Sequence, residues 1–312
     1  MNTLQREEGA PFDGVNAGFQ FLTLIGLFAV FIFIFTAIGQ FIALGITHEN
    51  VDLNRLSDPR VVLGLKIIQI FSALGGFIVP AIICTVLISR RPINYMGLNK
   101  TGNIGVMLLG GVLMLLAFPL INYLGELNSR LQLPPSMKSI QDLIQAGEDE
   151  ANKISNAFIL HQSFKGLLLN LFMMAFVAAV AEELFFRATL QKMLIKGTGN
   201  IHIGIWLTAI IFSAVHAEFF GFVPRMLMGA YLGYLFVWSG SIWVSIFAHF
   251  LNNGTVVFIS FLEERNLVSK KIEDFGNNSS QFGYVMASTV IVAILVYVIY
   301  RIENRKEVII IE

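Results

Sequence analysis

The stretch Ala181-Glu182-Glu183-Leu184-Phe185-Phe186-Arg187 places three charged side chains inside a long apolar run, from Leu167 to Leu194. A charge at the centre of a lipid bilayer costs about 2.5 to 3.5 kcal/mol on insertion scales, so such residues usually have a function. On a helix, Glu183 and Arg187 lie four residues apart on one face, where carboxylate and guanidinium can pair. Glu182 is rotated away from that pair. The stretch therefore predicts a functional site with one carboxylate left over; a structural ion cluster that ties helices together is the alternative.

The composition is that of an integral membrane protein. Of 312 residues, 55% are hydrophobic and only 13% are charged, unlike the average soluble domain. The 21 basic residues balance the 21 acidic ones, and no long basic run occurs, so nucleic acid is not an expected partner. The single cysteine, Cys84, excludes an intrachain disulfide and a thiolate metal cluster.

Eight apolar segments are long enough to cross a hydrocarbon core of about 30 Å as helices, although the fifth and sixth are short. They are residues 18–46, 61–88, 103–126, 165–194, 200–217, 220–238, 241–262 and 282–300. We expect one membrane-embedded domain over residues 1–312, folded as an all-α bundle of about eight transmembrane helices. In the sixth segment, Gly229 and Gly233 predict a close approach to a neighbouring helix.

The long connection between the third and fourth segments has an amphipathic pattern after Pro134-Pro135. Apolar residues recur near helical spacing against acidic ones, at Ile140, Leu143, Ile144, Ala151, Ile154 and Phe158. The pattern predicts an interfacial helix that caps the bundle, and a substrate-gating element is the alternative.

The distribution of Lys and Arg between the loops favours one orientation. The two sides are nearly balanced, but the long third loop holds several basic residues of its side, and long loops carry little weight. We therefore expect both termini on the cytoplasmic side, in the inner membrane of a bacterium.

Two later segments place further polar side chains at membrane depth. His216 lies near the end of the fifth segment, and His249 shares a helix face with Asn253 in the seventh. Counted from one side at 1.5 Å per residue, Glu182, His216 and His249 lie roughly 12 to 24 Å deep and can converge. A lone histidine of this kind is as readily a structural hydrogen-bonding residue.

These residues occur in the pattern Glu182-Glu183-x-x-x-Arg187, Phe212-x-x-x-His216 and His249-x-x-x-Asn253. Over residues 165–255, the chain resembles the CPBP family of intramembrane proteases. That family includes type II CAAX prenyl endopeptidases and bacteriocin-processing and self-immunity (Abi-like) proteins. The resemblance implies an eight-helix bundle that hydrolyses a peptide bond of a membrane-associated substrate, prenylated or bacteriocin-like.

The resemblance also implies a role for each site residue. Glu182 corresponds to the general base, and His216 helps to hold the attacking water. His249 and Asn253 correspond to donors to the oxyanion. Glu183 and Arg187 occupy the remaining positions of the motif, where they support these catalytic groups.

Other functions use the same residues. Two histidines and a glutamate form a common catalytic zinc set, so a zinc-dependent protease is the nearest alternative, although no cofactor is expected and no His-Glu-x-x-His helix occurs. A proton-coupled transporter could use Glu182 and Glu183 as a relay, but no internal repeat is visible. A membrane scaffold or immunity protein without proteolytic activity is the third alternative. The expected partners are the lipid bilayer and a peptide or protein substrate.

Overall fold

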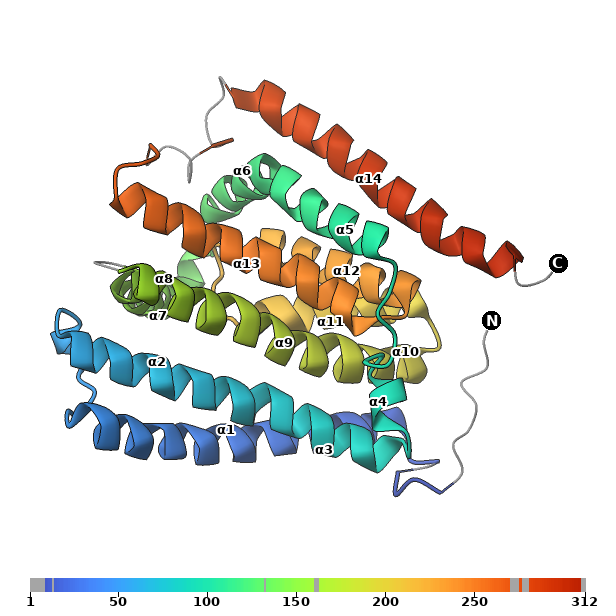
Figure 1. The fold of residues 1–312 in the computed structure, drawn as a ribbon, viewed down its shortest axis with the longest axis horizontal. Coiled ribbons are helices and arrows are strands. Elements are labelled where there is room, and N and C mark those ends of the chain that lie inside the picture. Colours follow the sequence, from blue (N-terminus) through green and yellow to red (C-terminus); the bar gives the residue numbers. More distant parts are fainter. Residues whose placement is uncertain are drawn as a thin grey trace.

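The computed structural model describes residues 9–12, 14–131, 133–159, 163–269, 275–276 and 281–309, with side chains of the last helix described as far as Asn304. Every regular element in these residues is helical, and none of them forms a strand (Figure 1). The prediction of an all-α protein is confirmed.

The amino-terminal part forms an antiparallel pair of long helices (Figure 1). Its elements are α1 (Ala17–Thr47), η1 (Leu53–Arg55), α2 (Pro59–Ala73), η2 (Leu74–Ile78), α3 (Val79–Ile88) and α4 (Pro92–Tyr95). Asn16 and Asp58 cap α1 and α2 with their side chains. Within the continuous helix Pro59–Ile88, Gly75 allows α1 to approach closely, since a Cβ there would lie 2.3 Å from the Cβ of Phe35.

One continuous helix, Phe164–Thr198, carries the charged stretch through the middle of the molecule, between α2 and α13 in Figure 1. It consists of α8 (Phe164–Asn170), η4 (Leu171–Val177), α9 (Ala178–Glu182), η5 (Glu183–Gln191) and α10 (Lys192–Thr198). η4 and η5 are π-helical, a distortion that is frequent at functional sites. Every residue of η5 is buried, so the charged stretch lies in the core.

The remaining helices pack around this central helix. They are α5 (Ile104–Leu116), α6 (Phe118–Ser129), α11 (Ile201–Ala214), α12 (Phe222–Ser239), α13 (Ile242–Glu264) and α14 (Phe282–Ile309). The predicted close approach at the sixth segment is confirmed. A Cβ on Gly229 would lie 3.3 Å from the Cα of Ala209 in α11, and one on Gly233 would lie 2.5 Å from Oε1 of Gln191 in η5.

In the described residues, fewer helices than the eight predicted spans pass a test of length and composition. In the described residues, each predicted segment is helical, but five helices are long and apolar enough to span a membrane. A sixth counts if α5 and α6, bent by 47° at their junction, form one span; Pro119 in the first turn of α6 explains the break. α11 has only 14 residues. The exact number of eight spans therefore stays a prediction.

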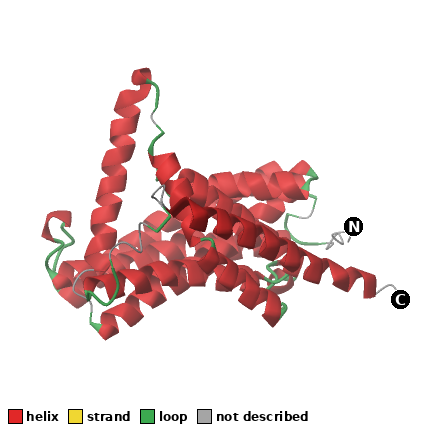
Figure 2. Ribbon diagram, turned by 90° about the horizontal axis from the view of Figure 1, so that it is seen from above, coloured by secondary structure: helices red, strands yellow, loops and turns green. Residues whose placement is uncertain are grey.

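α7 (Lys138–Ile159) is the helix predicted from the amphipathic connection, and it follows the short turn η3 (Pro135–Met137). It is seen end-on in Figure 1 and extends away from the bundle in Figure 2. Its carboxyl-terminal end is anchored, because Phe158 is buried, whereas Ile140 and Leu143 near its start are exposed. The helix is confirmed, and its location at the membrane surface stays a prediction.

Candidate active site

Two histidines from different helices lie beside the carboxylate of Glu182. Glu182 ends α9, His216 follows α11, and His249 belongs to α13. The Glu182 Oε2 atom lies 3.9 Å from His216 Nε2 and 3.7 Å from His249 Nε2. The side chain of His216 is 28% exposed and that of His249 only 2%. Three helices therefore bring polar side chains to one carboxylate, and the His216 side of this group is partly open.

Glu183 is the centre of a fully buried polar chain next to that group. Its Oε1 lies 3.0 Å from Nη1 of Arg187 and 2.9 Å from Nδ1 of His249. Arg187 also donates from Nη2 to the carbonyl oxygen of Gly229 in α12, at 3.2 Å. The ion pair predicted from the spacing of four residues is confirmed. This polar chain connects η5 to α12 and α13. Glu183 and Arg187 thus form an ion cluster that ties helices together, and Glu182 is not part of that cluster.

Phe212 is a site residue to which the sequence analysis gave no role. The centroid of its ring lies 4.4 Å from Cζ of Arg187, 4.9 Å from the His216 ring centroid and 6.0 Å from that of His249. A guanidinium over an aromatic face gains a cation–π attraction, which is larger where water is excluded. The Phe212 ring thus packs against Arg187 and against both histidines. Its place four residues before His216 in the motif was the available signal.

The hydrogen bonds at Nδ1 of the two histidines determine what each Nε2 atom can do. Nδ1 of His216 lies 2.7 Å from the carbonyl oxygen of Phe212, which can only accept, so Nδ1 carries the proton and Nε2 of the neutral ring is an acceptor. Nδ1 of His249 donates to the Glu183 carboxylate in the same way. Nε2 of His249 can then donate only when its ring carries both protons. Next to Glu182, His216 offers an acceptor and a protonated His249 offers a donor.

Asn253 lies one helical turn beyond His249 on α13 and is partly buried. Its Nδ2 donates to the carbonyl oxygen of Met174 over a long 3.4 Å, and its Oδ1 accepts from Asn252 at 3.1 Å. Neither of these bonds joins it to the glutamates. One N–H of the amide is left uncommitted by them, which is what a donor to a substrate requires.

No group of three or more His, Cys, Asp and Glu side chains is arranged to hold a metal ion in the described part of the chain. The Glu182 Oε2 atom lies 3.9 and 3.7 Å from the two histidine Nε2 atoms. Donor atoms of a tetrahedral zinc site lie about 3.4 Å apart, so these three side chains would have to move closer to bind zinc. A measurement of metal content therefore accompanies the activity test below.

A family model matches the part of the chain that carries these residues. Residues 164–255 match the family model described as type II CAAX prenyl endopeptidase Rce1-like. The matched segment contains every predicted site residue, from Glu182 to Asn253. Over this segment, the resemblance noted from the motifs is confirmed. Fold and match together define the class: a multi-pass integral membrane protein with a CAAX-protease-like segment.

Two curated relatives, both from Bacillus subtilis (strain 168), share part of the chain. The "Putative membrane peptidase YdiL" is 30% identical over 95 residues, which are 30% of this chain and 38% of that protein. The "Uncharacterized protein YpbD" is 32% identical over 77 residues, or 23% of this chain and 36% of that protein. The matches thus cover little more than a third of each relative. No solved structure matches the chain.

Proposed function

We propose that the protein is an intramembrane endopeptidase that hydrolyses a peptide bond of a membrane-associated substrate, with water activated by Glu182 and His216. The observation that carries the proposal is the placement of Glu182 between two histidine Nε2 atoms, at 3.9 and 3.7 Å. The neighbouring carboxylate, Glu183, is already paired with Arg187. Glu182 is therefore the carboxylate that is free to act as a base.

The distances suit one water molecule. A separation of 3.9 Å between Glu182 Oε2 and His216 Nε2 is too long for a direct hydrogen bond. One water at about 2.8 Å from each atom fits between them. Glu182 takes a proton from this water as the water oxygen attacks the carbonyl carbon of the peptide bond. The same proton then passes to the leaving nitrogen as the C–N bond breaks.

The negative charge that develops on the carbonyl oxygen needs hydrogen-bond donors, and α13 offers two residues for this role, one helical turn apart. His249 donates from Nε2 when its ring carries both protons, and Asn253 donates from the uncommitted N–H of its amide. Donors that are fixed before the reaction stabilise this charge by several kcal/mol where water is excluded. Glu183 holds His249 in the required orientation through the 2.9 Å bond to Nδ1.

The substrate we propose is a peptide or protein at the membrane. The matched family description supports a prenylated carboxyl terminus as the first substrate to test. Purified full-length protein in liposomes is incubated with a prenylated CAAX peptide, its unprenylated form and an unrelated transmembrane peptide. Mass spectrometry then identifies new termini. Cleavage of none of them, together with no new termini in membranes that contain the protein, would refute the endopeptidase.

The same assay separates the water-activating glutamate from a zinc enzyme. The sample is divided, chelated exhaustively, and assayed with and without added zinc while its metal content is measured. We expect chelation to leave cleavage unchanged. Stoichiometric zinc with chelator-sensitive, zinc-restored cleavage would replace the glutamate mechanism by a metal mechanism at the same residues.

Asn253→Ala should lower turnover by about 100-fold to 1,000-fold with little change in KM, because it removes one oxyanion donor that acts in the transition state. The control is Asn252→Ala, which removes the bond to Asn253 Oδ1 but leaves the Asn253 amide in place. We expect that control to stay within a few-fold of wild type. Equal loss in both variants would contradict the assignment of Asn253 as a donor.

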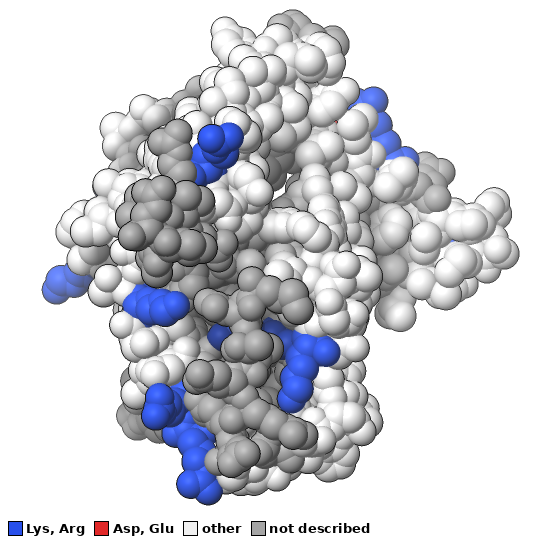
Figure 3. Space-filling model, turned by 90° about the vertical axis from the view of Figure 1, so that its right-hand side faces the viewer, with Lys and Arg blue, Asp and Glu red and all other residues white. Residues whose placement is uncertain are grey.

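We also propose that both termini are cytoplasmic, on the basis of the charges at the two ends of the bundle. α1 begins and α14 ends at the same end (Figure 1). The described residues visible on that end include Lys and Arg but no Asp or Glu (Figure 3). The connection from α3 to α5 contributes Arg90, Arg91 and Lys100 to it. Positive charge marks the cytoplasmic side of a membrane protein.

Reporter fusions at residues 1 and 312 should therefore both report the cytoplasm. A fusion in the loop between α1 and α2, after Asn50, should report the opposite side and serves as the control. Termini on opposite sides, or both on the outer side, would contradict the orientation.

A further inference from the structure

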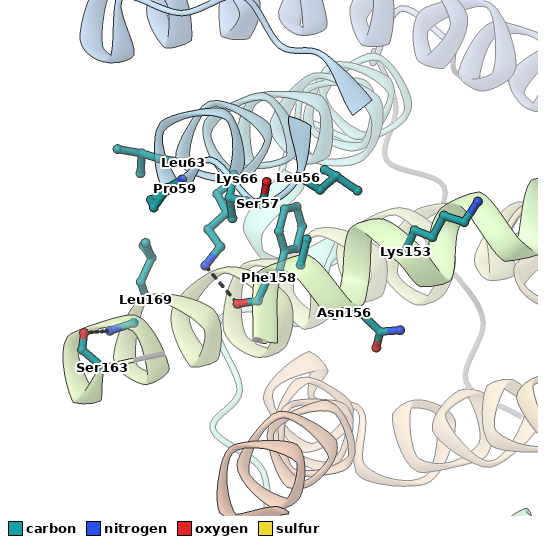
Figure 4. Close-up of a pocket in the computed structure, with 13 residues that line it drawn as sticks. Leu56, Ser57, Pro59, Leu63, Lys66, Lys153, Asn156, Phe158, Ser163 and Leu169 are labelled. Atoms are coloured by element: carbon teal, nitrogen blue, oxygen red, sulfur yellow. Dashed lines mark hydrogen bonds between the residues drawn. The ribbon is translucent and has the colours of Figure 1, made fainter. Parts of the chain in front are cut away.

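A cavity of about 750 Å³ lies outside the catalytic group, between the start of α2, the end of α7 and the start of α8 (Figure 4). Its wall is largely apolar, and the apolar lining residues are Leu56, Pro59, Val62, Leu63, Ala157, Phe158 and Leu169. The volume falls in the range of small-molecule sites, about 300 to 1,000 Å³. None of the catalytic residues proposed above lines it, so it is a separate space.

Two lysines and no carboxylate are found among its described lining residues. Lys66, in α2, is 7% exposed, and its Nζ donates to the carbonyl oxygen of Phe158 at 3.2 Å. Nζ also lies 5.5 Å from the centroid of the Phe158 ring. Lys153, on α7, is exposed and lies farther out (Figure 4). The cavity therefore has a deep cation and an outer cation on apolar walls.

The deep cation lacks a charge partner. An ammonium has three N–H donors, and Phe158 takes one of those of Lys66. That carbonyl oxygen also accepts from Nδ2 of Asn170 at 2.7 Å, so it is shared. No acidic side chain forms an ion pair with Lys66 within the described residues. A buried cation in a membrane-spanning helix is costly and is usually kept because it binds something.

The remaining lining groups also favour an anion. Ser57, Asn156 and Ser163 can donate hydrogen bonds, and Pro59 and Gly166 belong to the first turns of two long helices, Pro59–Ile88 and Phe164–Thr198. The amino-terminal end of a helix carries partial positive charge. These groups add to the positive charge of Lys66, the buried cation of the cavity.

We propose that this cavity binds the phosphate headgroup of an anionic membrane lipid, with Lys66 at the phosphate, Lys153 farther out at the rim and an acyl chain against the apolar wall. A lipid is favoured over a free phosphate because the cavity is far larger than phosphate and mostly apolar. It also lies where two predicted spans begin, at the depth of lipid headgroups. The site requires no proteolysis and stands independently of the proposed function.

Binding is measured by native mass spectrometry of the delipidated full-length protein in detergent, titrated with phosphatidylglycerol or with phosphatidylcholine of the same chains. We expect wild type to prefer phosphatidylglycerol. Lys66→Met keeps the length of the side chain without its charge, and it should weaken phosphatidylglycerol binding on the order of 10-fold to 100-fold, as loss of a hydrogen bond to a charged group does. Phosphatidylcholine binding should change little.

Further variants separate this site from general surface charge and from a structural lysine. Lys153→Gln should weaken phosphatidylglycerol binding by a smaller factor. Lys165→Gln removes an exposed lysine at the same end that does not line the cavity, and it should bind as wild type does. If Lys66 only holds Phe158, Lys66→Met will lower the thermal unfolding temperature of the lipid-free protein and leave the preference between the two lipids intact. That result, or equal binding of both lipids by wild type, overturns the proposal.

A competition with inorganic phosphate distinguishes the lipid from a soluble anion. We expect phosphate at millimolar concentration to leave phosphatidylglycerol bound. Displacement of the lipid by phosphate alone would show that the acyl chain contributes nothing, and it would refute a lipid site.

Discussion

Glu182→Gln should lower hydrolysis by about 100-fold to 10,000-fold, the range typical for loss of a general base. Glutamine keeps the size of the side chain and an oxygen that can accept a hydrogen bond, but its amide cannot take the proton of the attacking water. Because the Glu182 side chain is 15% exposed and lies outside the buried Glu183 chain, the substitution should leave folding intact. The measurement is kcat for the peptide that wild type cleaves, with thermal unfolding in the same detergent.

A nearby carboxylate provides the matched control. Glu218 lies in the turn after His216 and pairs with Arg225, with its side chain 39% exposed. Glu218→Gln should keep activity within a few-fold of wild type, because the paired carboxylate is not available as a base. If Glu182→Gln hydrolyses the peptide at a rate close to that of wild type, Glu182 is not the base, and the proposed mechanism fails.

The pair within one helix was predictable, and the contacts between helices were not. The spacing of Glu183 and Arg187 sets their separation on any helix, and the structure gives 3.0 Å. His249 reaches Glu183 from another helix, 66 residues along the chain. That contact depends on how α13 is rotated and how deeply it lies, which helical periodicity does not determine.

The different roles of the two glutamates also depend on contacts between helices. The sequence predicted that Glu182 would be left over, but it could not show that the Nδ1 atom of His249 faces Glu183 while its Nε2 faces Glu182. It also placed Phe212 in a motif without a role, because the contact of its ring with Arg187 needs α11 and η5 to be packed together. Tertiary contacts of this kind decide which residue is structural and which is available for chemistry.

The spans show where composition alone is insufficient. A strongly apolar run predicts a helix reliably, as for α1 and α14, because the cost of exposing unpaired backbone groups to lipid leaves little choice. α11 is shorter than a full span, and α5 bends into α6. A hydropathy pattern alone does not show where α11 ends or that α5 and α6 meet at an angle.

Arg187→Ala should destabilise the protein by about 3 to 5 kcal/mol, the range for removal of one partner from a buried ion pair. The side chains of Arg187 and Glu183 are both 0% exposed, so the variant leaves the Glu183 carboxylate without its guanidinium partner in a buried environment. It also removes the donor to the Gly229 carbonyl and the cation over the Phe212 ring. We expect a lower yield of folded protein, a lower thermal unfolding temperature in detergent, and loss of hydrolysis.

Three further variants test the reason for that loss. Arg187→Lys keeps the positive charge but replaces the planar guanidinium by an ammonium, and it should be more stable than Arg187→Ala but less stable than wild type. The double variant Glu183→Gln with Arg187→Met should lose less stability than the sum of the two single changes, because it leaves no uncompensated charge. Arg225→Ala breaks a more exposed ion pair, with Glu218 39% exposed, and should cost only about 0 to 1 kcal/mol. If Arg187→Ala unfolds at the wild-type temperature, Arg187 does not hold the buried chain together, and the orientation of His249 must come from another contact.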